Sequence, residues 1–174
     1  MKTRHPWWTV VDGSRQYVRK LIPPFQDRIR LNTPVQRIER HEGKVIIHTA
    51  GQPAETYDKV ILATHAPTSL KMLAQPTVLE QELLSAFKYQ PNIATLHTDE
   101  SFMPKSKKCW ASWNYRIDQD AAGKIQPTTI YWMNRLQGVS ERQNYFVSIN
   151  GENRIGPAKV IKRIQYEHPL FNLD

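Results

Sequence analysis

The spacing of apolar and polar positions predicts short helices and a strand meander in the first half of the chain, followed mainly by strands. Residues 15–22 show a helical pattern, with basic residues on one side and an apolar stripe on the other: Tyr17, Val18, Leu21 and Ile22. The turn 12–14 supplies capping groups before this helix, and Pro23-Pro24 ends it. Three runs joined by short turns then predict an antiparallel meander over 35–40, 45–49 and 55–57.

The stretch 57–73, YDKVILATHAPTSLKML, is the centre of the predicted fold. Residues 60–63 are apolar at every position, a pattern that favours a strand buried on both faces, as in the middle of a parallel sheet. A turn follows, and Pro67 suits the first turn of a helix that stops at Pro76. Thr77 and Glu80 then form a capping box at the start of another helix.

The second half of the chain is rich in β-branched and aromatic residues. Strands are predicted over 93–98, 109–116, 128–136, 145–150 and 160–166. Residues 118–126 are expected to form a hairpin loop in which Gly123 adopts positive φ. The predicted fold class is α+β, a single domain over 1–174 with a mixed, largely antiparallel sheet of about five to seven strands and helices on one face.

Composition and charge exclude several classes of protein. With 174 residues, 40% of them hydrophobic, the chain can bury a core, but its apolar runs are too short to span a bilayer. The basic residues behind the net charge of +8 are scattered, which favours a solvated face over nucleic-acid binding and leaves peripheral contact with anionic membranes open. The single cysteine, Cys109, suits a reducing, cytoplasmic compartment. The histidines lack metal-ligand spacing, so no metal site is predicted.

Two groups of residues are candidates for chemistry. His97 and Asp99 alternate on one strand face, where they can act as acid and base in a cavity or form a hydrogen-bonded pair at a strand end. Aromatic residues interleaved with asparagines can pack a sheet or line a cavity for an apolar substrate. The residues predicted to face a substrate are Trp113, Asn114, Tyr131 and Asn134.

Seven segments carry a resemblance to a known family: TVVDGSRQYVRKL (9–21), LNTPVQRIER (31–40), YDKVILATHAPTSLKML (57–73), LHTDESFMP (96–104), WASWNY (110–115), YWMNRLQ (131–137) and EHPLFN (167–172). They resemble the flavin-containing amine oxidase superfamily, and more narrowly the bacterial FAD/NAD(P)-binding proteins found beside cyclopropane-fatty-acid synthases. The resemblance implies a remnant of the FAD-binding part over 9–73 and a substrate-domain part over 77–174.

The same resemblance implies FAD as the cofactor of the parent protein, contacted at positions that match the family's motifs: Ser14, Val35, Ala63, Thr64 and His65. Four departures from the family's pattern stand beside this match. Asp12 replaces a glycine of the family's pattern, and no G-x-G-x-x-G motif for the diphosphate occurs. The family's C-terminal flavin-contacting segment and the lysine that many amine oxidases place near the flavin also have no counterpart here.

We therefore expect a fragment of an FAD-dependent oxidoreductase whose parent acts on an organic small molecule, lipid-linked substrates included. The chain alone is expected to be inactive and to bind FAD weakly or not at all. The competing interpretation is a non-enzymatic binding or assembly module with a basic, aromatic surface. Self-association or a displaced N-terminal helix is also expected, because the stripe over 17–22 and the strand over 60–63 lack part of their cover.

Overall fold

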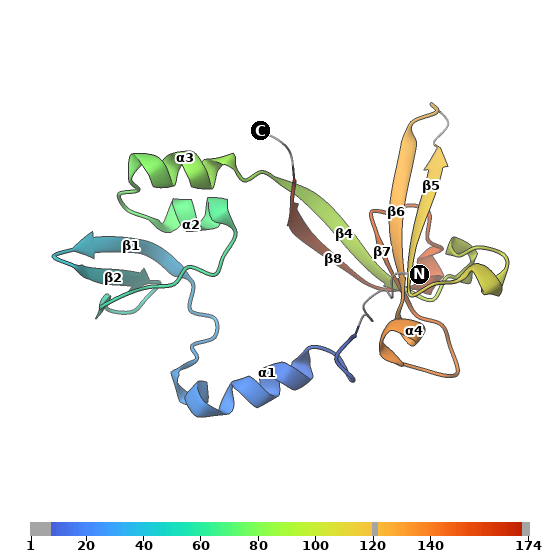
Figure 1. Ribbon diagram of the computed structural model, residues 1–174, viewed down its shortest axis with the longest axis horizontal. Coiled ribbons are helices and arrows are strands. Elements are labelled where there is room, and N and C mark those ends of the chain that lie inside the picture. Colours follow the sequence, from blue (N-terminus) through green and yellow to red (C-terminus); the bar gives the residue numbers. More distant parts are fainter. Residues whose placement is uncertain (1–7, 120–121, 172–174) are drawn as a thin grey trace, which may run out of the picture. The chain divides into compact units, whose positions relative to one another are not determined.

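The computed structural model describes residues 8–119 and 122–171 (Figure 1). The chain divides into two compact units, one of residues 1–26 and 91–167 and one of residues 27–90 and 168–174. We call them the five-stranded unit and the three-stranded unit, after their sheets. The chain was predicted as a single domain, and the structure divides it into these two units. The assignment of 9–73 to a cofactor-binding part and of 77–174 to a substrate part stays a prediction.

The helices and strands follow in this order: α1 (Arg15–Leu21), β1 (Val35–His41), β2 (Lys44–Thr49), β3 (Glu55–Tyr57), α2 (Ala66–Met72), α3 (Val78–Ala86), β4 (Tyr89–His97), β5 (Trp113–Gln119), β6 (Ile125–Trp132), α4 (Met133–Gln137), β7 (Phe146–Ile149) and β8 (Val160–Pro169). Short 3-10 helices occupy Pro23–Arg28, Glu100–Phe102, Lys107–Cys109 and Pro157–Lys159.

The three-stranded unit contains the predicted meander. β1, β2 and β3 pair antiparallel in sequence order, and the turn between β1 and β2 places Gly43 at φ 75°. Figure 1 shows α2 and α3 beside this sheet. Ile38 of β1 is only 2% exposed, and its carbonyl accepts a hydrogen bond of 2.9 Å from the N–H of Ala74, just after α2. The predicted strands thus form around their turns. Ile38 connects β1 to the residues just after α2.

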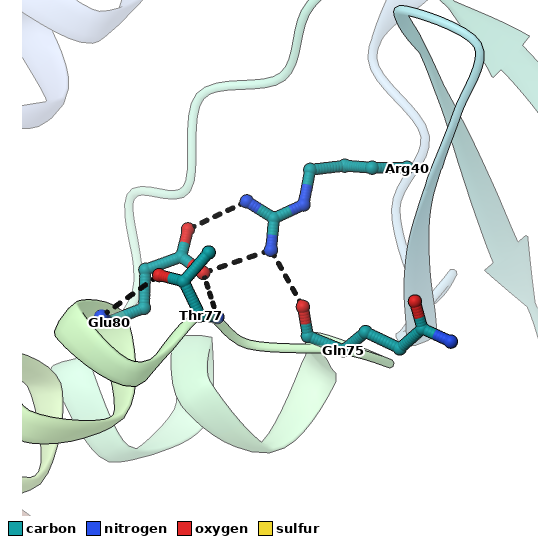
Figure 2. Close-up of polar contacts among 4 residues, drawn as sticks. All are labelled: Arg40, Gln75, Thr77 and Glu80. Carbon is teal, nitrogen blue, oxygen red and sulfur yellow. Dashed lines mark hydrogen bonds and ion pairs between the residues drawn. The ribbon is translucent and has the colours of Figure 1, made fainter.

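Arg40 on β1 holds the start of α3 through a bidentate ion pair (Figure 2). Its guanidinium donates hydrogen bonds of 2.8 and 2.9 Å to Glu80 and one of 2.8 Å to the carbonyl of Gln75. Glu80 also accepts from the N–H of Thr77 at 2.7 Å, and its own N–H donates to the Thr77 hydroxyl at 3.2 Å. The predicted capping box is confirmed, and the same carboxylate ties the helix to the meander.

The stretch 60–63 does not form the predicted buried strand. It has no regular secondary structure, and Ile61 is 92% exposed. Within the described residues no strand is paired with it. Because a strand needs a neighbour to satisfy its backbone N–H and C=O groups, apolarity alone does not produce one. The following helix forms as predicted, with Pro67 in its first turn.

The five-stranded unit contains a sheet in the order β5-β6-β7-β4-β8. The pairs β5–β6, β6–β7 and β7–β4 are antiparallel, which confirms the predicted α+β class and its largely antiparallel pairing. The β5–β6 loop contains Gly123 at φ 78° as predicted, although residues 120–121 lie outside the described part.

Two of the strand boundaries predicted in this unit were wrong. The strand expected over 128–136 ends at Trp132, because α4 begins at Met133 and ends at Gly138, whose φ of 63° is a left-handed helix cap. The strand expected from Cys109 begins at Trp113, after the 3-10 turn that contains Cys109.

The core of this unit lies on one face of the sheet. Its buried members are Phe102, Met103, Trp110, Ile130, Phe146 and Ile155. Gly151 is required at its edge, because a Cβ there would meet the side chains of Phe102 and Thr128 at 2.9 Å. The segments that follow β4 and β7 therefore cover this face of the sheet. They do not cover the other face.

The helix predicted near the N-terminus forms as α1, but its apolar stripe is uncovered. None of its residues is buried, and Leu21 is 62% exposed. Ser14 precedes it with helical angles (φ −60°, ψ −21°) and makes no side-chain capping bond, contrary to the prediction that the turn 12–14 caps the helix.

We predict that Glu80 makes the three-stranded unit sensitive to acid. The hydrogen bonds from Arg40 and from the N–H of Thr77 lower the pKa of Glu80 from 4.5 to about 2. Since this carboxyl has the lower pKa in the folded state, its stabilisation is complete above about pH 4.5 and is lost as the pH falls toward about 2. Chemical unfolding of Glu80→Gln should depend less on pH in that window than unfolding of the matched variant Glu82→Gln on the same helix. Identical pH profiles for the two variants would contradict the prediction.

Candidate functional site: an open apolar sheet face

The most distinctive surface of the described chain is the uncovered face of the five-stranded sheet. Along β5, exposed and partly buried residues alternate, and the exposed ones include Trp113 (55%), Tyr115 (54%) and Ile117 (63%). The indole of Trp113 and the ring of Tyr115 are stacked, with centroids 6.2 Å apart. An aromatic pair this exposed is unusual on a folded sheet, where such rings normally contribute to burial.

The strand register extends this surface across four strands. Trp113 lies opposite Tyr131, which lies opposite Val147, and Tyr115 lies opposite Thr129. Residues directly opposite one another in an antiparallel pair share a face. We call this surface the open face; its members on β4 to β7 are Ala94, Leu96, Trp113, Tyr115, Ile117, Pro127, Thr129, Tyr131, Val147 and Ile149.

None of these positions carries a charge, although the chain as a whole has a net charge of +8. Equivalent positions along a strand repeat about every 7 Å, so the three rows that start at Trp113, Tyr115 and Ile117 extend about 14 Å along the strands. The surface is therefore long, apolar and aromatic, which suits the hydrocarbon part of a ligand.

The covered face carries the charges of these same strands. Asp118 forms an ion pair with Arg116 at 2.7 Å and a second one with Arg154. Both guanidinium groups also lie over the ring of Phe102, with their carbon atoms 5.0 and 5.4 Å from its centroid. Alternation along the strands thus separates a charged, packed side from an apolar, open side.

Of the residues predicted to face a substrate, two lie together on the open face and two have structural roles. Trp113 and Tyr131 are directly opposite each other. The Asn114 side chain accepts from the Ala111 N–H at 3.0 Å and donates to the Ala111 carbonyl at 2.7 Å. The Asn134 side chain spans the loop after α4, donating to the carbonyls of Ser140 and Gln143 and accepting from the Tyr145 N–H, each at 2.7 Å. The two asparagines therefore shape loops, whereas the two rings are available to a ligand.

His97 and Asp99 are packed into the five-stranded unit, away from solvent. His97 is fully buried; its Nδ1 accepts from the Asp99 N–H at 3.1 Å, so its ring proton lies on Nε2 and is donated to the Ser148 hydroxyl at 2.7 Å. Burial lowers the pKa of His97 from 6.5 to about 4, and the Asp99 charge offsets this only in part. The pair in this position is a satisfied hydrogen-bonding unit.

Asp99 is occupied as well. Its carboxylate accepts from the N–H and hydroxyl of Ser101, at 3.1 and 2.7 Å, and from the N–H of Gly156 at 2.9 Å. Burial raises its pKa, but these hydrogen bonds outweigh the effect and lower it overall. Asp99 thus caps the short helix after β4 and fixes the loop before β8.

The residues predicted to contact a cofactor are distributed over both units. Val35 belongs to the three-stranded unit and begins β1, where a bulge shifts the pairing between Val35 and Arg37. It lines a hollow of about 590 Å³ together with Thr33, Arg28, Arg30, Thr49, Glu55 and Tyr57. Ser14 belongs to the five-stranded unit and is exposed.

Ala63, Thr64 and His65 precede α2 and do not line that hollow. The Thr64 hydroxyl is bonded to Ser69 at 2.7 Å, and His65 stacks on Tyr89 with ring centroids 4.4 Å apart. The Tyr89 hydroxyl also accepts the N–H of Ala66, the first residue of the helix. Local contacts therefore engage Thr64 and His65, whereas Ala63 is exposed, and contact of these residues with a cofactor stays a prediction.

The described residues contain no group of three or more His, Cys, Asp or Glu side chains arranged to hold a metal ion. No helix in residues 8–119 or 122–171 combines the length and apolarity needed to cross a bilayer.

Comparisons with known proteins identify one matching family and a solved structure with a similar fold. The profile of a family described as flavin containing amine oxidoreductase matches residues 1–153. Among solved structures, a fatty acid isomerase from P. acnes that produces CLA is similar with a TM-score of 0.63 and 16% identity. The similarity covers 93% of this chain and 41% of the isomerase chain, so the present chain spans less than half of that protein. No curated protein matches.

We predict that His97 makes the five-stranded unit lose stability under mildly acidic conditions. The unfolded chain takes up a proton at His97 below about pH 6.5, whereas the folded chain does so only near pH 4. Stability is therefore highest above pH 6.5 and falls by about 3 kcal/mol as the pH drops to about 4. Urea unfolding between pH 4 and 7 should show this slope in the natural chain and in the exposed control His41→Gln, and a flatter profile in His97→Gln. A slope that persists in His97→Gln would show that another group is responsible.

Proposed function

Because the chain belongs to the family of flavin-containing amine oxidoreductases, as the match over residues 1–153 shows, we propose that it forms the substrate side of an FAD-dependent oxidoreductase. The proposed substrate is an organic molecule with a long apolar chain, such as a fatty acid or another lipid. In the whole protein the FAD, when bound, supplies the redox chemistry, and the residues of this chain bind and orient the apolar part of the substrate.

The open face is the observation that carries this proposal. Ten positions on four strands form one uncharged surface, and its most exposed members are Trp113, Tyr115 and Ile117. Burying such a surface contributes about 25 cal/mol for each Å² removed from water. A hydrocarbon chain laid along the rings gains this energy, and the polar side-chain atoms of the face are limited to the hydroxyls of Thr129 and the two tyrosines.

The proposed lipid substrate agrees with the name of the solved protein that is similar in fold. The similar solved protein is a fatty acid isomerase, and the likeness covers nearly all of the present chain. At 16% identity this likeness concerns the fold, so the inference about the substrate rests on the apolar chemistry of the open face. His97 and Asp99 take no part in the proposed reaction, because both are enclosed by their own hydrogen bonds.

The described residues fit FAD only in part. Val35 lines the hollow, and the bulge between Val35 and Arg37 interrupts the regular ladder next to it, which suits contact between backbone groups and one end of the cofactor. The sequence has no G-x-G-x-x-G to hold the diphosphate. We accordingly infer that tight FAD binding requires residues beyond those of this sequence.

The exposed thiol of Cys109 supports a reducing, cytoplasmic location for the protein.

Binding of an acyl chain to the open face can be tested by fluorescence. Dibrominated stearate should quench the tryptophan emission of the natural chain, because its bromine atoms would lie against Trp113. Tyr115→Lys should weaken this quenching at least about tenfold, since a charge is placed in the apolar surface while Trp113 remains as the reporter. Leu31→Lys is the matched control, an exposed leucine (79%) changed in the other unit. Equal quenching of both variants would overturn the proposed substrate site.

The partial fit to FAD gives a second test. The purified chain should lack the visible absorbance of bound flavin, and titration with FAD should show no saturable change at micromolar concentration, because no motif holds the diphosphate. A known flavoprotein titrated in parallel provides the positive control. Purification with stoichiometric flavin would show that the residues of this chain suffice for the cofactor.

A further inference from the structure

β8 is the outermost strand on one side of the five-stranded sheet and, at ten residues, the longest strand among the described residues (Figure 1). Two backbone hydrogen bonds join it to β4, from the Thr98 N–H to the Lys159 carbonyl at 3.0 Å and from the Leu170 N–H to the Lys88 carbonyl at 2.9 Å. No strand of residues 8–119 or 122–171 pairs with its other side. Alternate N–H and C=O groups of β8 therefore point away from the sheet without a ladder partner.

The side chains of β8 leave this edge open. Every residue from 161 to 168 is exposed, on both faces of the strand. Three of them are large and apolar: Ile161 (53% exposed), Ile164 (51%) and Tyr166 (38%). A long, exposed edge strand with apolar side chains is a template on which a further strand can add through backbone hydrogen bonds.

The charges of β8 indicate which strand fits this edge. Charged side chains on an edge commonly oppose pairing with other chains. On β8, however, the charges have both signs, and Arg163 and Glu167 are four positions apart, which places them on the same face of the strand. An identical strand that runs antiparallel, with Gln165 opposite its own copy, brings Arg163 of each chain opposite Glu167 of the other. The same alignment sets Ile164 opposite Tyr166, a β-branched and aromatic pair that favours strand pairing.

We infer that β8 is a self-pairing edge through which two copies of this chain form a symmetric dimer, joined antiparallel about Gln165. The two-fold axis uses each favourable pair twice, as an isologous interface requires. A register centred on Ile164 instead places Glu167 opposite Ile161, so the opposite charges no longer meet. The sequence of β8 thus selects both the occupant of the edge and the register in which it pairs.

Interactions within the chain leave the two charged groups able to take part. Arg163 donates one hydrogen bond, to the Glu152 carbonyl at 3.2 Å, and a guanidinium has five donors in all. Glu167 also takes part in an interaction within its own chain, and a carboxylate accepts several hydrogen bonds. The paired stretch 163–167 is short, so the interface is small and the dimer is expected to be weak, with a dissociation constant of about 1 to 100 µM.

Sedimentation velocity of the full chain over about 1 to 500 µM tests the inference, because charge reversal can be combined between two chains. The natural chain should sediment increasingly as a dimer. Arg163→Glu places two carboxylates opposite each other, and Glu167→Arg places two guanidinium groups so; each should weaken self-association at least about tenfold. An equimolar mixture of the two variants should associate like the natural chain, since every pair is again of opposite sign. Damage to the fold of one chain would not be repaired by the other.

Matched controls come from a loop of the same unit. Glu141→Arg and Arg142→Glu reverse exposed charges away from β8 and should leave self-association unchanged. Tyr115→Lys, on the open face, should also retain the dimer.

Three results would overturn the inference. The first is a chain that stays monomeric up to about 500 µM. The second is a dimer that persists in Arg163→Glu and Glu167→Arg but is lost in Tyr115→Lys, which would identify the open face as the interface. The third is a mixture of the two β8 variants that remains monomeric. Acyl-chain quenching of the β8 variants separates this inference from the proposed function, because it reports on Trp113 and requires no dimer.

Discussion

The antiparallel ladder of β5, β6, β7 and β4 is the constraint on which the functional surface depends. Because side chains alternate across a strand and opposite residues share a face, the register fixes every position of this sheet at once. It places Arg116 and Asp118 on the side where Phe102 and Trp110 form the core, and Trp113, Tyr131 and Val147 on the other. A slip of one residue along β5 would move Arg116 and Asp118 to the open side and turn Trp113 and Tyr115 toward the core.

Polar residues near the core contribute to the architecture more than to chemistry. His97 and Asp99 have the residue types of an acid–base pair, but their hydrogen-bonding capacity is taken up by Ser148, Ser101 and the Gly156 N–H. Buried polar groups are costly unless they are paired, so these contacts hold β4, β7 and the loops around them in one arrangement. The surface proposed to bind a ligand is instead the open face, whose positions carry no charge.

Short-range signals predicted much of the structure correctly. The meander, the capping box at Thr77 and the positive φ of Gly123 depend on neighbouring residues alone, and all three form. The predicted strand at 60–63 does not form, because a strand depends on a partner that these residues cannot specify. The amides of Asn114 and Asn134 bond to nearby carbonyl and N–H groups, which residue spacing alone does not reveal.

The sequence by itself determined the α+β class, the helix and turn signals, and the resemblance to flavin-dependent enzymes through the segments around Ala63 and Trp113. Only the tertiary structure decided that Trp113 and Tyr131 form one surface, that Asn114 and Asn134 do not belong to it, and that His97 is enclosed. The physical reason is that facing and burial are set by strand register and long-range packing, which involve residues far apart in the chain.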